Sequence, residues 1–89
     1  METYRQNPSI AWNVIGDQVV AVSLGEERRI HEFSEVASVI WQHLNSGINF
    51  EELHQVVVDQ FEVEPAEARK DLRDLLDDLT AKGLVEVHP

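Results

Sequence analysis

Two short apolar segments near the start of the chain are rich in β-branched residues, which favour strands. These segments cover residues 9–15 and 18–24, and the two residues between them, Gly16 and Asp17, are a typical signal for a tight hairpin. Glycine supplies the positive φ that a primed turn needs. The pattern therefore predicts a β-hairpin at the start of the fold.

A third strand is predicted over residues 28–33, after a break at residues 25–27. Its alternation is poor, because Arg29, His31 and Phe33 fall on one face while Ile30 lies between charged residues on the other. Mixed charge of this kind protects the edges of sheets from indiscriminate pairing. We therefore expect this strand at the edge of a three-stranded antiparallel sheet.

From Ser34 onward the apolar spacing becomes helical, and Ser34 itself is a good N-cap for a helix over residues 35–45. The second helix is marked more strongly, because Asn49 and Glu52 have the spacing of a capping box and Phe61 closes its apolar stripe. Two helices are therefore expected in this part of the chain.

A third helix is predicted from Pro65, which suits a first helical turn, to a C-cap at Gly83. Residues 84–87 follow as a short apolar tail that either adds a strand or packs on the core. The predicted fold class is α+β, a three-stranded antiparallel sheet followed by three helices. This order resembles a winged helix-turn-helix.

Length and composition favour one small soluble domain over residues 1–89. Hydrophobic residues make up 43% of the chain, and the absence of cysteine excludes disulfides and thiolate chemistry. The polar N-terminus has no targeting pattern, and no apolar run approaches the ~20 residues that span a bilayer. We therefore expect a cytoplasmic protein that does not contact a membrane.

The charge balance is strongly acidic, with 7 Lys and Arg against 17 Asp and Glu and a net charge of −10. Such a field repels phosphate backbones. Residues 65–82, where a winged helix would read DNA, carry four basic against five acidic residues. The sequence therefore predicts no nucleic-acid partner, and a winged-helix regulator is kept only as an alternative.

Catalytic and metal-binding constellations are not visible in the sequence. The four histidines are dispersed without HxxxH spacing, and no glycine-rich phosphate motif or GxSxG occurs. The many carboxylates of the third helix suit a solvated face better than acid–base work. We expect a protein that is not an enzyme, with no catalytic residue, no metal site and no cofactor.

The third helix has two unlike flanks when its leucine stripe is placed inward. Arg69 and Arg73 fall on one flank, and Asp71 and Asp78 fall on the other. Two readings stay open: the charges serve solubility, or the arginines border a groove for an acidic partner.

The predicted edge strand offers a second route to a partner, because its unpaired backbone groups can accept an extended peptide by strand addition. Ile30 is either an isolated surface residue or a contact for that peptide. An edge strand beside a basic helix flank, in a domain without catalytic groups, favours peptide binding.

The segment from Phe33 to Leu84 resembles the PqqD-like family of pyrroloquinoline quinone biosynthesis proteins, also called RiPP recognition elements. Trp12 and the hairpin precede it in the family's order. The similarity rests on an apolar-polar pair before the first helix, a glycine break, the start of the second helix and a closing leucine repeat, in this chain Phe33-Ser34, Ala37, Ile40-Trp41, Gly47, Glu52-Leu53, Phe61, Leu72, Leu75, Leu76, Leu79 and Gly83-Leu84.

This resemblance implies a domain that binds the leader of a ribosomally made precursor peptide and presents it to a modifying enzyme or leader protease. In the family the leader pairs with the third strand and lies against the third helix. Carried onto this sequence, the implied peptide-binding residues are Arg28, Arg29, Ile30, His31 and Glu32 on the strand, and Arg69, Leu72, Arg73 and Leu76 on the helix.

One segment departs from the family. Members of the pyrroloquinoline quinone group often carry a Pro-Glu-Gly-like turn before the third strand, whereas this chain has Leu-Gly-Glu-Glu-Arg at residues 24–28. The resemblance therefore leaves the pathway open between pyrroloquinoline quinone, lasso peptide and other products. The alternatives are a DNA-binding regulator and a scaffold that binds only folded protein.

Overall fold

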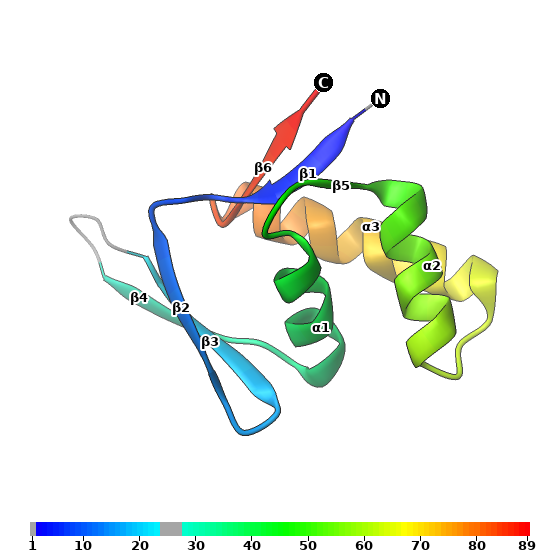
Figure 1. Cartoon of the computed structure of the whole chain (residues 1–89), viewed down its shortest axis with the longest axis horizontal. Helices are drawn as coiled ribbons and strands as arrows, with labels where there is room; N and C mark the ends of the chain where they lie inside the picture. The colour runs from blue at the N-terminus through cyan, green and yellow to red at the C-terminus, as the bar shows by residue number, and fades with distance from the viewer. Residues whose placement is uncertain (1, 24–27) are drawn as a thin grey trace.

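The computed structural model describes residues 2–23 and 28–89, which form six strands and three helices (Figure 1). The predicted antiparallel sheet is present, with strand order β2-β3-β4. Its strands are β2 (Ile10–Ile15), β3 (Gln18–Ser23) and β4 (Arg29–Glu32). The break predicted at residues 25–27 lies outside the described residues.

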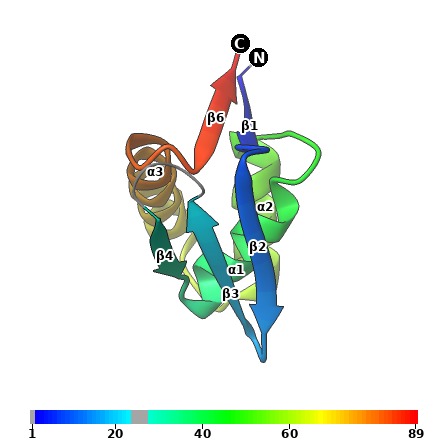
Figure 2. The same cartoon turned by 90° about the vertical axis from the view of Figure 1, so that its left-hand side faces the viewer.

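A second sheet was not predicted from the sequence. It has the order β5-β1-β6 and consists of β1 (Thr3–Gln6), β5 (Ile48–Asn49) and β6 (Val85–His88). It brings the two ends of the chain side by side, as Figures 1 and 2 show. The tail at residues 84–87 therefore adds a strand.

β1 was not predicted because its sequence is mostly polar. Gln6 is buried, yet its side-chain amide donates to the carbonyl of Trp41 at 2.7 Å, and its backbone N–H donates to that of Leu44. Asn7 ties the strand to the end of the last helix through Gly83 and Leu84. Hydrogen bonds to distant carbonyls offset the free-energy cost of burying these polar groups.

The three helices are α1 (Glu35–His43), α2 (Phe50–Gln60) and α3 (Pro65–Ala81). The predicted caps are present, since the Ser34 side chain accepts from the Ala37 N–H and the Asn49 side chain accepts from the Glu52 N–H. Both satisfy orphan donors of a first turn. Gly83 follows α3 with φ +76°, a conformation that ends a helix at little cost in glycine.

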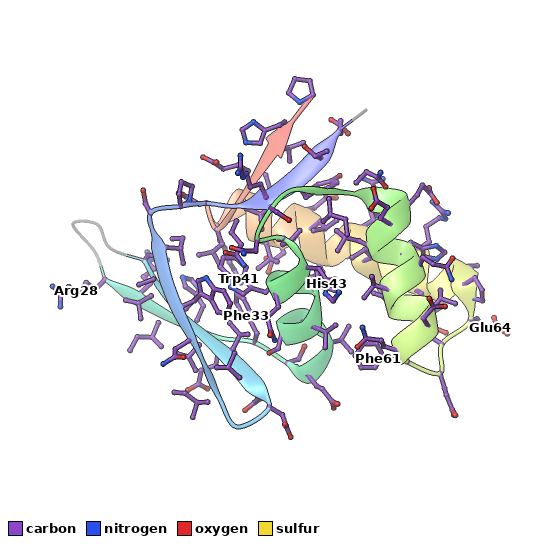
Figure 3. All side chains as sticks on the ribbon, viewed as in Figure 1. Arg28, Phe33, Trp41, His43, Phe61 and Glu64 are labelled. Atoms are coloured by element: carbon purple, nitrogen blue, oxygen red, sulfur yellow. The ribbon has the colours of Figure 1, made fainter. Side chains whose placement is uncertain are left out.

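The core lies where the helices meet the inner face of β3. Trp41 is completely buried at its centre and makes edge-to-face contacts with Phe33, 5.3 Å between centroids, and with Trp12, 6.2 Å. Figure 3 shows Phe33 and Trp41 together between α1 and the sheet. These rings anchor the β2-β3-β4 sheet on α1.

Candidate functional site

The outer edge of β4 is unpaired within residues 2–23 and 28–89, because β4 pairs only with β3. The Phe33 N–H donates to the Val19 carbonyl at 3.0 Å, so the odd-numbered residues of the strand bond to β3. Backbone groups alternate in direction along a strand. The N–H and C=O groups of Ile30 and Glu32 therefore point outward, where another strand can bind them.

A groove of about 390 Å³ lies between β4 and α3. Figure 2 shows the two elements adjacent, with β4 below α3. Ala37 of α1 and Leu84, which follows α3, line part of the groove. Its helix wall is formed by side chains that recur with helical spacing on α3 and its C-cap, namely Leu75, Asp78, Leu79 and Lys82.

The groove has an apolar base and a charged rim. Leu79 is buried and Leu75 half-buried, whereas Asp78 and Lys82 are exposed and form an ion pair of 3.0 Å. His31 lies on the strand side, with its Nε2 3.3 Å from the Ser23 hydroxyl. Such a channel suits an extended chain that places apolar side chains inward and polar groups at the rim.

Three of the five predicted strand residues line this groove: Ile30, His31 and Glu32. Ile30 is 70% exposed, which is high for an isoleucine. Arg29 belongs to β4 but lies outside the groove lining, and Arg28 points away from the body of the protein in Figure 3. Two of the five predicted residues therefore lie beyond the groove itself.

The predicted helix residues occupy other places. Leu72 and Leu76 are buried in the core, with 2% and 0% of their surface exposed. Neither lines the groove, because both side chains pack in the hydrophobic core. The family pattern predicts that they contact a bound leader; this stays a prediction, and in the structure both side chains pack in the core.

Arg69 and Arg73 lie on another flank of α3, which faces β1 and α2. The Arg69 guanidinium makes two hydrogen bonds to the Glu51 carboxylate, at 2.7 and 2.9 Å. Arg73 donates to the Tyr4 hydroxyl at 2.9 Å and stacks 4.2 Å from the Phe50 ring centroid. Both arginines are engaged within the domain, and neither lines the groove with β4.

The Glu51–Arg69 pair also sets the electrostatics of that flank. The hydrogen bonds from Arg69 lower the pKa of the Glu51 carboxyl, and the same contact raises the pKa of Arg69. Each group thus stabilises the charged form of the other.

The groove residues of α3 were missed because helical periodicity identifies flanks without saying which flank faces β4. Asp78 had been assigned to the acidic flank, and Leu75 to the leucine stripe. Their spacing with Leu79 and Lys82 was the available signal. Only the packing of α3 turns that flank toward the edge strand.

Three further observations on the described residues concern places outside this groove. A larger cavity, about 470 Å³, lies near the junction of β1 and β2 and is lined by none of the predicted site residues. In residues 2–23 and 28–89 no cluster of three potential metal ligands occurs. No helix in this part of the chain is long and apolar enough to cross a membrane.

Two solved structures resemble this fold. One, described as TbiB1 in complex with the TbiA(beta) leader peptide, is 28% identical, with a TM-score of 0.84 over 92% of this chain and 94% of that one. The other is a lasso peptide synthetase B1 complexed with the leader peptide, 23% identical, with a TM-score of 0.80 over 93% and 96%. Comparison with curated protein sequences gives no match.

Sequence comparison identifies the family directly. The family model described as coenzyme PQQ synthesis protein D (PqqD) matches residues 20–85, which include β4, all three helices and the groove between them. The match confirms the resemblance found in the sequence, and this chain belongs to the PqqD family.

Proposed function

We propose that this domain binds the leader segment of a ribosomally synthesised precursor peptide by adding it as a strand to β4. The observation that carries the proposal is the unpaired edge of β4 beside the groove of α3. Two outward-facing residues, Ile30 and Glu32, offer the backbone groups of an antiparallel or parallel ladder. The PqqD match and the leader-bound state of both similar structures support the same partner.

The added strand has two faces because its side chains alternate. One set enters the groove toward Leu75 and Leu79, and the other set lies on the outer face of the sheet beside Ile30. Arg28 lies directly before β4 and Arg29 is its first residue, and these cations attract leader carboxylates. Backbone pairing therefore supplies affinity, while the groove selects the sequence.

We propose that the domain holds the leader without catalysing a reaction, and that a modifying enzyme or leader peptidase of the same pathway acts on the held precursor. One of the two similar structures is a lasso peptide synthetase B1, and this likeness favours a lasso-peptide pathway over pyrroloquinoline quinone synthesis. A cytoplasmic site of action fits a precursor that is modified where it is made.

The test is an amide-shift titration of labelled protein with the synthetic leader of the short precursor encoded beside its gene. Binding in the micromolar to nanomolar range should perturb the amides of Ile30 and Glu32 most, since these N–H groups gain acceptors. An unchanged spectrum, or shifts confined to the Arg69 and Arg73 flank, would contradict strand addition at β4. A random DNA duplex at ~0.15 M salt serves as the test of the regulator alternative, and no binding is expected.

A proline variant tests the ladder itself. Ile30→Pro removes an outward N–H while leaving the inward bonds of β4 to β3 in place, so leader affinity should fall at least tenfold. The matched control is Val14→Pro, at an outward position on the opposite edge of the same sheet, which should bind the leader normally. Full binding by the Ile30 variant would contradict the proposal.

A further inference from the structure

A second, smaller cavity continues the groove and points to a further binding site for the leader. It has a volume of about 120 Å³ and lies where α1, the end of α2 and the first half of α3 meet. Apolar side chains form its walls, among them Val36, Phe61 and Val63. In Figure 3, Phe61 projects from the end of α2 toward the first turn of α1.

The cavity and the groove share a wall. Leu75 lines both, and the neighbouring residues Val36 and Ala37 of α1 line the cavity and the groove respectively. On α3 the lining residues of the two spaces form one stripe with helical spacing, in order Lys82, Leu79, Asp78, Leu75, Leu72, Asp71 and Ala68. The cavity is therefore the continuation of the groove past the end of β4.

The length of the stripe agrees with a peptide longer than the strand. Fourteen steps of helix separate Ala68 from Lys82, about 21 Å at ~1.5 Å per residue. An extended peptide covers that distance with about six residues at ~3.3 Å each. Because β4 has only 4 residues, a chain that follows the stripe continues beyond the ladder and over Ser34.

The chemistry of the cavity defines what it accepts. Its volume of about 120 Å³ is below the ~150 Å³ of an apolar cavity that binds benzene, so it has room for one aliphatic side chain. Asp71 is its one charged lining residue within the described chain, and a carboxylate at the rim repels an acidic side chain. An apolar residue, with no acidic neighbour, fits both features.

We infer that this cavity is a second recognition site of the same leader, which receives one apolar side chain from the residues that follow the β4-paired segment on the Ser34 side. The inference rests on the proposed function and adds a sequence requirement to it. The ladder accepts many sequences through the backbone, whereas the cavity selects the leader by one anchored side chain.

The experiment follows methyl and amide signals in one titration with the leader described above. The methyl groups of Val36 and Val63 should shift with the same midpoint as the amide of Ile30. Shifts at Ile30 without any at the two valines would overturn the second site and leave the proposed function intact. An absence of shifts at all three positions would overturn both.

A charged variant measures the contribution of the cavity. Val36 is 38% exposed, so Val36→Glu leaves the core in place while it puts a carboxylate at the cavity mouth. Leader affinity should fall about tenfold, which corresponds to ~1.4 kcal/mol. Val14→Glu is the matched control, because Val14 is 41% exposed, lies outside both spaces, and should bind the leader normally.

An alanine scan of the leader identifies the anchored residue. At one apolar leader position, replacement by alanine should lower the affinity for the wild-type protein about tenfold. The same replacement should change the affinity for Val36→Glu only slightly. Equal losses with both proteins at every leader position would contradict the second site, because independent sites give additive effects.

Discussion

The two flanks of α3 carry unlike charges and have unlike surroundings. On one flank, Arg69 and Arg73 are already held by Glu51, Tyr4 and Phe50. On the other, Asp78 and Lys82 border an open groove beside the unpaired edge of β4. A basic side chain on a helix therefore indicates a binding surface only when no other group of the domain already binds its N–H donors.

The comparison also separates affinity from stability. The arginine flank joins three segments that are far apart in sequence, since Tyr4 and Arg73 belong to β1 and α3 and Phe50 to α2. On the groove flank the ion pair of Asp78 and Lys82 stays within one helix, and Leu75 is only half-buried. We expect substitutions on the arginine flank to change the free energy of unfolding, and substitutions on the groove flank to change leader binding.

The largest effect on stability is expected on the side of α3 that faces the core, between the two flanks. Leu76→Ala should lower the free energy of unfolding by about 2–5 kcal/mol, because Leu76 is completely buried. Leu75→Ala, one residue away on the groove side, should lower it by less than about 1.5 kcal/mol. Urea unfolding of both variants measures the contrast, and equal losses would mean that Leu75 belongs to the core.

The ranking of leader affinities should follow the groove. Leu75→Ala should weaken leader binding about tenfold, since it removes a wall shared by both spaces. Arg73→Glu should change the affinity by less than about twofold at 0.15 M salt, where the Debye length is ~8 Å. Calorimetric titration distinguishes the two. The opposite ranking would support the sequence-based prediction that Arg69 and Arg73 bind the leader.

A smaller effect is expected from the contacts of Arg73. Arg73→Met removes the stacking on Phe50 and the hydrogen bond to Tyr4, and should lower the free energy of unfolding by about 1 kcal/mol. Tyr4→Phe removes only the hydrogen bond and should cost less. A double-mutant cycle of these two changes should give a favourable coupling, and additive losses would contradict the contact.

The smallest effect concerns pH and the Glu51–Arg69 pair. Because the folded state lowers the pKa of Glu51, the pair contributes stability above the unfolded pKa, roughly 4.3, and loses it as the pH falls through the folded pKa. The urea midpoints of wild type and Glu51→Gln should therefore differ slightly near pH 7 and converge in acid. A difference that persists in acid would assign another role to Glu51.

The sequence by itself determined the local elements, because each depends on neighbours in the chain. The hairpin at Gly16, the caps at Ser34 and Asn49, and the glycine stop at Gly83 are all local signals, and all are present. The edge position of β4 was also readable, since mixed charge at alternate positions is a local property.

Only the tertiary structure decided the second sheet and the helix wall of the groove. β1 has few apolar residues, and it pairs with β6 across almost the whole chain, which no local pattern encodes. Periodicity divided α3 into flanks, but the rotation of α3 about its axis depends on how Leu72 and Leu76 meet the core. That packing turns the arginines toward Glu51 and Tyr4, and it leaves Leu75 and Asp78 beside the open strand.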